Sequence, residues 1–301
     1  MNWKNERTMP RIFSFFRRPF RLMLACWLLG TLFACSRRDA EVTDYPLERV
    51  LQLFHDERAP QVLVTAHRAR HTRYPENSLA AIRDAIAGGA DIVEVDVRTT
   101  RDGRMILMHD SDIDRTTDGR GKVKDLTWKE LQQYHLQGGG DTCRIPLLEE
   151  ALLTARGRIM VDLDMKGVHV LPLVRMVQHT GTARQVIFFD ADTAVLDSVL
   201  LVDSTLMIMP RAHDTAELRR LLIRYDAPVV HIDDSFFTPE VVRAIRDDGA
   251  RVWINALGKP DLMAAAGIWK GYKELTGGGA GILQTDRPVR LNIYLTKQGL
   301  R

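Results

Sequence analysis

Cysteine is scarce in this chain. Only three cysteines occur among 301 residues, at positions 26, 35 and 143. Three cysteines cannot build a scaffold that depends on several disulfides. The chain also has no cluster of cysteines or of several histidines with the spacing of zinc ligands, which argues against a zinc site. Cys26 and Cys35 fall in a leader described below, so Cys143 is expected to stay unpaired and no intramolecular disulfide is predicted.

The chain also lacks an excess of one charge. Its formal net charge is +3, but residues 1–34 hold six basic residues against Glu6, so the rest of the chain carries a formal charge of −2. A weakly acidic chain lacks the basic surface of nucleic-acid-binding proteins. We therefore expect no nucleic-acid partner.

No hydrophobic run is long enough to span a bilayer. The longest, residues 22–33, has twelve mostly apolar residues after a basic stretch, whereas a transmembrane helix needs about 20. This pattern is typical of an export signal, and its end, residues 32–35, resembles a bacterial lipoprotein box. We expect residues 1–35 to be a lipoprotein-type signal peptide with Cys35 as the acylated lipid anchor; the alternative is a plain signal peptide cut nearby. The mature chain would then be an exported, membrane-anchored lipoprotein of the cell envelope, facing the periplasm or the exterior.

The remaining sequence has ordinary globular composition, with 45% hydrophobic and 27% charged residues, which is ample for a large core. Residues 36–58 are read as a tether and a lead-in helix. From there strand-like segments alternate with helix-like ones, a rhythm that implies a parallel sheet. Strands are predicted at 61–66, 92–97, 158–164, 185–189, 206–209, 229–232, 251–255 and 281–285, and helices at 78–88, 147–155, 171–179, 193–201, 215–225 (with Thr215 as N-cap) and from 238. Eight such units predict an α/β fold, a (β/α)₈ TIM barrel over residues 59–301.

One further strand-like segment, 105–108, does not fit this series. It follows the second strand after a tight turn with Asp102 and Gly103 at its tip, a geometry that permits only an antiparallel return. Residues 101–145 are therefore predicted to be a small insertion between the second strand and its helix. The glycine runs at 138–140 and 277–279 are predicted to be loops.

Charged and polar residues gather where the barrel strands end. Glu94 and Asp96 are two residues apart, so on a strand they point to the same side, and burying both is costly without a cation between them. Active sites of TIM barrels lie at the carboxyl ends of the strands. The positions that agree with this geometry are His67, Arg68, Glu94, Asp96, Asp164, Lys166, Trp253, Asn255 and Asp286. His109 and Asp110 end the further strand-like segment 105–108.

These residue types suit metal-assisted chemistry at phosphorus. Glu94, Asp96 and Asp164 can hold one hard divalent cation, Ca²⁺ or Mg²⁺, through carboxylate oxygens. Asp162 shares a face with Asp164 and is a competing ligand. Arg68 and Lys166 would bind the phosphate, while His67 and His109 would act as general base and acid.

At this point the sequence resembles the glycerophosphodiester phosphodiesterase family, within the phosphatidylinositol-phospholipase-C-like phosphodiesterase superfamily. The motifs that carry the resemblance are His67-Arg68-Ala69, Pro75-Glu76-Asn77-Ser78, Glu94-x-Asp96-Val97, Thr100-x-Asp102-Gly103, His109-Asp110, Arg115-Thr-Thr-x-Gly-x-Gly121 and Ile145-Pro-x-Leu-Glu-Glu150. The resemblance runs from about residue 61 to 290. It implies hydrolysis of small glycerophosphodiesters to an alcohol and glycerol 3-phosphate. In this family His67 and His109 would be the acid/base pair, and the substrate's own glycerol hydroxyl would attack phosphorus to give a cyclic phosphate.

Three positions depart from the family pattern. Ala69 replaces a glycine and adds a methyl group where the loop would need a positive φ. Asp164 stands where a glutamate is usual, although the related sphingomyelinase D group has aspartate there. Gln284 replaces an apolar residue near the end of the last strand.

Weaker assignments and rival functions complete the set of expectations. Glu76 and Trp253 are expected to line the substrate pocket, with a helix-start acid and a core aromatic as their alternatives. The other histidines (His55, His71, His135, His169, His179, His213 and His231) are expected to be surface or structural residues. One rival function is a phospholipase that acts on intact lipid or on a glycerophosphate polymer, for which the Phe188-Phe189 and Phe236-Phe237 pairs are small hints. The other rival is a catalytically inactive binding lipoprotein. The sequence does not indicate an oligomeric state.

Overall fold

The computed structural model describes residues 45–140 and 143–301. The expected signal peptide, the lipid anchor at Cys35 and most of the tether lie outside the described residues and stay predictions. In the described part of the chain, no helix has the length and apolarity needed to cross a membrane.

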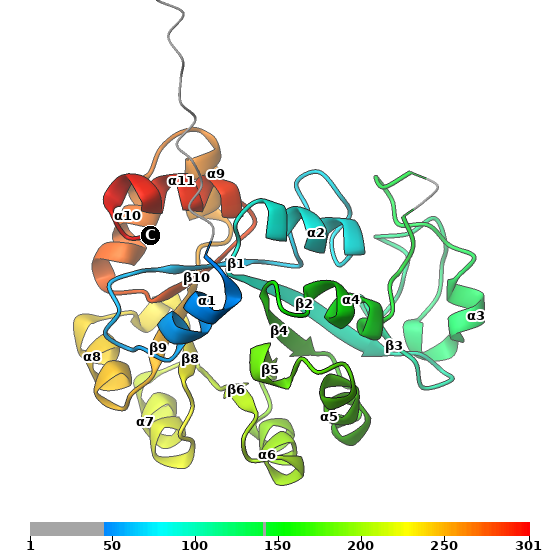
Figure 1. Cartoon of the computed structure of the whole chain (residues 1–301), viewed down its shortest axis with the longest axis horizontal. Helices are drawn as coiled ribbons and strands as arrows, with labels where there is room; N and C mark the ends of the chain where they lie inside the picture. Colours follow the sequence, from blue (N-terminus) through cyan, green and yellow to red (C-terminus); the bar gives the residue numbers. More distant parts are fainter. Residues whose placement is uncertain (1–44, 141–142) are drawn as a thin grey trace, which may run out of the picture. The chain divides into compact units, whose positions relative to one another are not determined.

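A parallel β-barrel forms the centre of the described structure (Figure 1). Its neighbouring strands run in the order β6-β5-β4-β2-β1-β10-β9-β8-β7. The bounds are β1 Leu63–Ala66, β2 Ile92–Thr99, β4 Met160–Met165, β5 Val186–Phe189, β6 Met207–Met209, β7 Arg211–Ala212, β8 Val229–Ile232, β9 Arg251–Asn255 and β10 Ile282–Thr285.

Strands β6 and β7 are separated only by Pro210. Proline has no N–H and cannot donate to a strand ladder, yet the Pro210 carbonyl still accepts a hydrogen bond from the His231 amide at 2.9 Å. β6 pairs with β5 on one side and β7 with β8 on the other, so the interrupted segment closes the barrel as one strand would. The predicted (β/α)₈ fold is confirmed.

The helices that follow the strands begin where capping residues predict. Ser78, Asp192 and Thr238 each accept a hydrogen bond from the first turn of α2, α6 and α8, which satisfies an amide that the helix cannot pair itself. The N-cap of α7 is Asp214, one residue before the predicted Thr215. The bounds are α1 Leu47–Phe54, α2 Leu79–Ala87, α4 Leu148–Ala155, α5 Val170–His179, α6 Thr193–Val202, α7 Thr215–Arg224 and α8 Pro239–Asp247, with short 3-10 turns at Ala183–Gln185 and Asp234–Phe236.

Three helices in the last part of the chain were not predicted. They are α9 Lys259–Ala265, α10 Lys270–Gly278 and α11 Pro288–Gln298. The prediction of a loop at 277–279 is wrong, because α10 includes Gly277 and Gly278 and ends only at Gly279, whose φ of 100° lies in the left-handed region. A glycine just after a helix is a stop signal, and here the two preceding glycines belong to the last helical turn.

The predicted insertion is also confirmed. β3, Met105–Leu107, returns antiparallel to β2 after the turn with Gly103 at φ 77°. The chain then forms a 3-10 turn η1, Val123–Asp125, and a short helix α3, Trp128–Leu131, before it rejoins the barrel at α4. The insertion has a core of its own, made by Ile106, Met108, Ile113, Val123, Leu131, Leu136 and Ile145.

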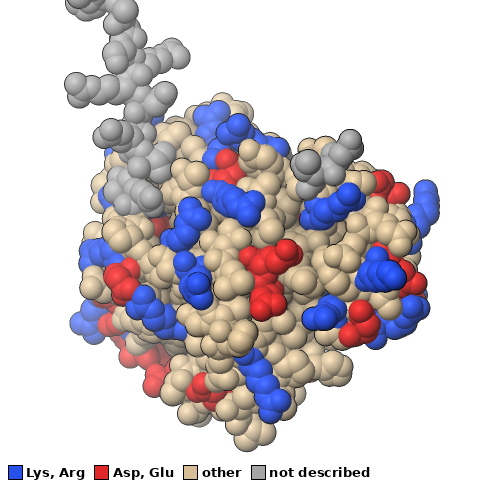
Figure 2. Space-filling view, turned by 45° about the vertical axis from the view of Figure 1, so that its right-hand side comes forward, with Lys and Arg blue, Asp and Glu red and all other residues tan. Residues whose placement is uncertain are grey.

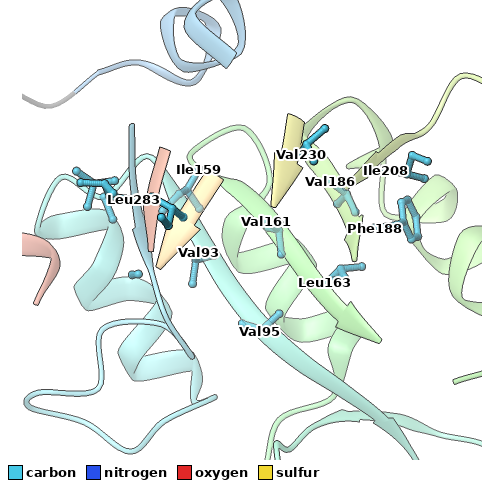
Figure 3. Close-up of a cluster of buried hydrophobic side chains, with 14 of the residues drawn as sticks. Val93, Val95, Ile159, Val161, Leu163, Val186, Phe188, Ile208, Val230 and Leu283 are labelled. Atoms are coloured by element: carbon cyan, nitrogen blue, oxygen red, sulfur yellow. The ribbon is translucent and has the colours of Figure 1, made fainter. Parts of the chain in front are cut away.

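Side chains alternate between two cores along each strand. Outward residues pack against the helices; Figure 3 shows Val93, Val95, Val161, Leu163 and Phe188 in this layer. Inward residues at the amino ends of the strands, such as Leu63, Ile92 and Met160, form a second core together with α1. This apolar layer fills the lower part of the barrel, and the inward carboxylates Glu94, Asp96 and Asp164 lie further up, toward the carboxyl ends.

Candidate active site

Three carboxylates from two adjacent strands meet inside the barrel. In the parallel register of β2 and β4, Glu94 pairs with Asp162 and Asp96 with Asp164. One carboxylate oxygen from each of Glu94, Asp96 and Asp164 lies within 4.8 Å of the others. The three predicted metal ligands therefore form one cluster.

Burial and mutual repulsion disfavour the charged forms of these acids. Burial first, and then the neighbouring Asp96, Asp162 and Asp164 charges, raise the pKa of Glu94 well above its ordinary value. The pKa of Asp164 is raised by burial as well, against the opposing effect of Lys166. Negative groups gathered in this way are stabilised as anions when a cation lies among them.

Lys166 supplies one positive charge at this cluster. Its Nζ atom lies 2.6 Å from Asp164 Oδ2 and 3.4 Å from Asp96 Oδ1. Burial works against its charged form, but these carboxylates outweigh burial and raise the pKa of Lys166. The ammonium group is thus held, charged, at the edge of the carboxylate cluster.

The loop between β1 and α2 folds over the carboxylates in a strained conformation. Arg68, Ala69 and Asn77 have positive φ angles of 48°, 62° and 55°, a region that costs a non-glycine residue about 1–2 kcal/mol. The Arg68 amide donates to Glu94 Oε2 at 2.6 Å, and the Asn77 side chain donates to Asp96 Oδ2 at 2.8 Å. The strained backbone therefore aims hydrogen-bond donors at two of the three carboxylates. Ala69, with its positive φ, keeps the conformation expected for glycine.

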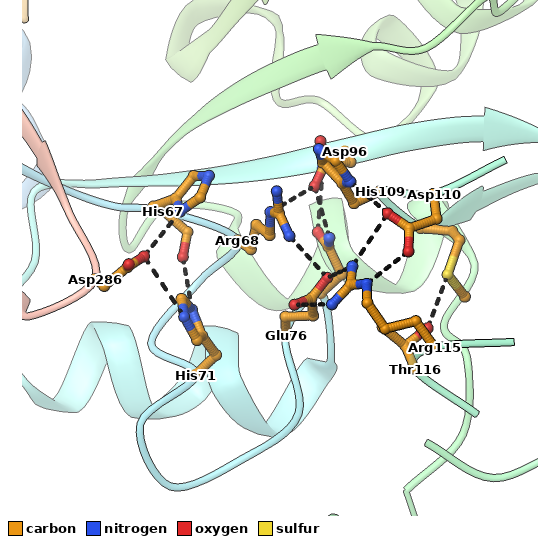
Figure 4. A network of polar contacts seen from close by, with 12 residues as sticks. His67, Arg68, His71, Glu76, Asp96, His109, Asp110, Arg115, Thr116 and Asp286 are labelled. Atoms are coloured by element: carbon orange, nitrogen blue, oxygen red, sulfur yellow. Dashed lines mark hydrogen bonds and ion pairs between the residues drawn. The ribbon is translucent and has the colours of Figure 1, made fainter. Parts of the chain in front are cut away.

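His67 is held by a carboxylate from the last strand. Its Nδ1 atom lies 2.8 Å from Asp286 Oδ1 (Figure 4). Asp286 is in turn fixed through its backbone, because its amide donates to Asp261 Oδ2 on α9 at 2.7 Å. His71 lies beside this pair, with Nε2 3.5 Å from Asp286 Oδ1 and Nδ1 3.0 Å from the His67 carbonyl oxygen.

His109 has a matching arrangement on the opposite side of the site. Its Nδ1 atom lies 2.7 Å from Asp110 Oδ1, and its carbonyl oxygen accepts hydrogen bonds from the Arg98 guanidinium at 2.9 and 2.6 Å. Hydrogen bonds from Arg115 hold the pKa of Asp110 well below its usual range. His67 and His109 therefore each present Nε2, the nitrogen that the neighbouring carboxylate does not engage.

Arg115 joins the insertion to the barrel at this point. Its guanidinium contacts both carboxylate oxygens of Glu76, at 3.0 and 2.7 Å, and Asp110 at 2.6 Å. Glu76 also accepts from Arg68 Nη1 at 3.2 Å. Figure 4 shows the resulting chain of contacts from Arg68 to His109.

Most of the barrel, with the carboxylate cluster and both histidines, matches a known protein family. The family model described as glycerophosphoryl diester phosphodiesterase matches residues 67–254. The chain belongs to the glycerophosphoryl diester phosphodiesterase family.

Relatives of this family in other organisms match part of the chain. Glycerophosphodiester phosphodiesterase 1 of Mus musculus is 37% identical over 158 residues, which cover 50% of this chain and 46% of the mouse protein. A glycerophosphodiester phosphodiesterase of Bacillus altitudinis is 40% identical over 112 residues, or 35% of this chain and 45% of that protein. The chain thus spans about half the length of the curated relatives it matches.

Solved structures of the family share the fold. A glycerophosphodiester phosphodiesterase from Agrobacterium tumefaciens superposes with a TM-score of 0.67 at 24% identity, covering 77% of this chain and all of that one. A phosphodiesterase from Oleispira antarctica, whose structure contains the product sn-glycerol-3-phosphate, has a TM-score of 0.66 at 22% identity and covers 78% of this chain and 97% of its own. At these identities the likeness establishes the barrel alone.

The barrel of this family member does not place every predicted residue at the site. Trp253 is fully buried, in the same core as α1, and donates to Gln284 Oε1, so its position supports the core-aromatic alternative. Asp162 is buried below the cluster, and burial raises its pKa well above the ordinary value. Glu76 lines a cavity of about 380 Å³ between residues 71–76 and the insertion, together with His71 and Arg115.

Several site residues lacked an assigned role in the sequence. His71 was expected at the surface or in a structural role, yet it lies against the His67–Asp286 pair. The contacts of Asn77 with Asp96 and of Arg115 with Glu76 join residues from different segments and leave no periodic signal in the sequence. Two signals for a role at the site were available in the sequence. Asp110 directly follows His109, and Asp286 lies at the end of a predicted strand.

Proposed function

We propose that this protein hydrolyses glycerophosphodiesters to an alcohol and glycerol 3-phosphate in a metal-dependent reaction. Its central support is a carboxylate cluster at the carboxyl end of the barrel, flanked by two histidines that each contact a carboxylate through Nδ1. Family membership supports the same reaction.

The residues at the cluster fit a hard divalent cation. Glu94, Asp96 and Asp164 offer only oxygen ligands, which Ca²⁺ and Mg²⁺ prefer. Burial, and to a smaller extent the neighbouring carboxylates, raise the pKa values of Glu94 and Asp164. When bound, such an ion supplies Lewis-acid stabilisation of charge on phosphoryl oxygens. An assay of activity with each ion in turn distinguishes Ca²⁺ from Mg²⁺.

The two histidines would divide the proton transfers. With Nδ1 donating to a carboxylate, a neutral imidazole carries its lone pair on Nε2 and can accept a proton. One histidine would take the proton of the glycerol hydroxyl that attacks phosphorus, and the other would give a proton to the oxygen of the leaving alcohol. The product of this step is a cyclic phosphate, and reversal of the two roles would let water open it to glycerol 3-phosphate.

Arg68 and Lys166 would hold the phosphate during these transfers. Arg68 is 18% exposed, with its guanidinium between Glu76 and Asp96, and Lys166 lies at Asp164. Two fixed cations beside a phosphodiester both bind it and offset the charge that grows on its oxygens.

The rival functions find less support. The binding-lipoprotein alternative rested on Ala69, which keeps the required left-handed conformation. The aromatic hints for a lipid substrate are explained by packing, because Phe188 and Phe189 are buried and Phe236 and Phe237 pack against the main core.

Replacement of either histidine tests the assignment. His67→Ala and His109→Ala should each lower kcat for glycerol 3-phosphate release by about 10²–10⁴-fold, the usual contribution of acid/base catalysis, with an unchanged circular dichroism spectrum. His179→Ala, at an exposed position near the end of α5, is the matched control and should keep full activity. A folded His67 or His109 variant with near wild-type kcat would refute the assignment.

A further inference from the structure

A second, smaller cavity is lined in part by Lys166, the lysine at the carboxylate cluster. It has a volume of about 180 Å³, and the residues that line it include Arg98, Thr99, Ser111, Lys122, Lys124 and Lys166. Four of these are cationic, and none of the lining residues is acidic. Since a water molecule occupies about 30 Å³ in the liquid, the cavity has room for a phosphate or carboxylate group.

Two lining residues connect this cavity to the reaction site. Lys166 contacts Asp164 and Asp96, two of the proposed metal ligands. Arg98 donates two hydrogen bonds to the carbonyl oxygen of His109. A group bound in the cavity would therefore lie beside Lys166, which contacts the proposed cation site, and beside Arg98, which contacts the proposed acid/base residue His109.

The remaining cations come from the insertion on a fixed piece of backbone. Val123, between the two lysines, is buried in the core of the insertion, and its amide donates to the Ser111 carbonyl at 3.0 Å. Lys122 and Lys124 themselves are exposed. In the part of the chain that the structure describes, the ion pairs at this cavity involve Lys166 but neither of these lysines, so their charges are available to a ligand. The four cationic side chains, with no acidic residue among the lining, therefore indicate an anion.

The larger cavity near Glu76 differs in charge. It has Arg73 and Arg115 but also Glu76 among its lining residues. Glu76 is already paired with Arg115 and Arg68. On the face shown in Figure 2, acidic and basic side chains are likewise interspersed. Of these two cavities, only the small one has a lining without an acidic residue.

We propose that the cavity formed by Arg98, Thr99, Lys122, Lys124 and Lys166 binds a second anionic group, a phosphate or carboxylate carried by the alcohol moiety of the substrate. This inference rests on the proposed glycerophosphodiesterase function and defines its substrate class. The preferred substrates would be glycerophosphodiesters whose alcohol is itself negatively charged, as in a fragment of a glycerophosphate polymer.

Two substrates that differ by one phosphate test this preference. Glycerophosphoglycerol and glycerophosphoglycerol phosphate share the scissile bond and the attacking glycerol, and the leaving glycerol of the second carries an additional phosphate monoester. An exposed ion pair changes an equilibrium by a factor of roughly 1.4 to 5, so two lysines together should raise kcat/KM for the phosphate-bearing substrate about tenfold. The preference should shrink as ionic strength rises.

Variants of the two lysines link the preference to the cavity. Lys122→Gln/Lys124→Gln in the full-length protein should reduce the preference to about twofold or less and leave kcat/KM for glycerophosphoglycerol within about twofold of wild type. Lys129→Gln/Lys273→Gln removes the same charge at exposed positions outside the cavity and should keep the preference. Lys122→Glu/Lys124→Glu should reverse it.

The outcomes separate this inference from the function on which it rests. If no glycerophosphodiester is hydrolysed with either ion, the proposed function fails. If both substrates are hydrolysed without a preference, or with one that survives the double substitution, only the anionic subsite is refuted. Inhibition by inorganic phosphate that depends on the two lysines, without substrate preference, would mean that the cavity binds free anions and would also overturn the substrate assignment.

Discussion

At the scale of single residues, two carboxylates hold the proposed acid/base histidines in place. Asp286 and Asp110 each contact Nδ1 of a histidine, at 2.8 and 2.7 Å. A carboxylate at this position fixes the ring and selects the tautomer whose Nε2 accepts a proton. We therefore expect Asp286 and Asp110 to be positioning residues that act through His67 and His109.

Replacing the carboxylate by an amide should leave the ring in place with the wrong tautomer. The amide group introduced by Asp286→Asn can donate to Nδ1 of His67, which would leave the proton on Nε2. We expect kcat to fall about 100-fold or more, in the manner of other amide-for-carboxylate changes at a histidine, while KM stays within about threefold.

The control for this change is Asp226→Asn. Asp226 is exposed and lies between α7 and β8, at the amino end of the barrel strands. The kcat and KM of Asp226→Asn should therefore match those of the wild type. A rise in KM with unchanged kcat in Asp286→Asn would instead assign Asp286 to substrate binding.

Some of these residues could be predicted from the sequence, because strand geometry determines the face of the sheet to which each side chain points. Glu94 and Asp96 had to share a face, and the strand containing Asp164 was expected to place it nearby; the cluster within 4.8 Å follows. Asn77 could not be given a role in this way, since its contact with Asp96 depends on how a left-handed loop folds back onto β2. Ala69 lies in the same loop and has a left-handed backbone conformation, in which a glycine would be less strained.

At the scale of elements, one buried side chain of β9, Arg251, holds α1 at the amino end of the barrel. The Arg251 guanidinium on β9 donates to the carbonyl oxygens of Leu53, Asp56, Gln61 and Gly281. Burial lowers the pKa of Arg251 to about 10. Its hydrogen bonds connect the last turn of α1 and the following loop to two strands.

Removal of this guanidinium should destabilise the fold strongly. Arg251→Met keeps a long side chain but leaves several buried carbonyl groups without a donor, and we expect the free energy of unfolding to fall by about 3 kcal/mol or more. Urea unfolding measures the loss, and hydrogen exchange should rise first in α1. Arg243→Met, at an exposed position of α8, should change the stability by less than about 0.5 kcal/mol; an equally small change for Arg251→Met would refute the tethering role.

The element predictions succeeded where the βα rhythm is regular. The eight expected strand positions are occupied even though Pro210 divides one of them. The rhythm does not extend to the connection between β9 and β10, which holds both α9 and α10. That departure matters for the site, because Asp261 on α9 accepts hydrogen bonds from the Tyr272 and Thr285 hydroxyls and from the Asp286 amide, and so fixes the carboxylate that holds His67.

At the scale of the barrel as a whole, a buried histidine makes stability depend on pH. His231 on β8 is 4% exposed, near Phe189 and Trp253, and neither ring nitrogen has a hydrogen-bond partner. Burial, and to a smaller extent Arg211, lower the pKa of His231 to about 3. Between pH 6.5 and 3 the unfolded chain therefore binds a proton at this residue that the folded chain does not, and its contribution to stability falls as the pH falls.

This dependence should disappear when His231 is replaced by leucine. From about pH 7.5 to 5.0 the lowered pKa should reduce the free energy of unfolding of the wild type by about 2 kcal/mol more than that of His231→Leu. Buried acids with raised pKa, such as Glu94, act in the opposite direction, but they are present in both proteins and cancel in the comparison. Urea unfolding at the two pH values measures the difference, with the exposed His179→Leu as control. Equal pH dependence in all three proteins would show that His231 is protonated in the folded state or exposed to water.

We propose that the carboxylate cluster, with a bound cation, and the two histidines together hydrolyse glycerophosphodiesters. The most direct measurement is glycerol 3-phosphate release from glycerophosphocholine and glycerophosphoethanolamine by the purified protein, first with EDTA and then with Ca²⁺ or Mg²⁺ restored. We expect that release stops with EDTA and returns with one of these ions, because Glu94, Asp96 and Asp164 offer the oxygen ligands that hard cations prefer. Release that continues undiminished in EDTA would contradict the metal-dependent mechanism, and no release from a folded protein with either ion would contradict the proposed activity.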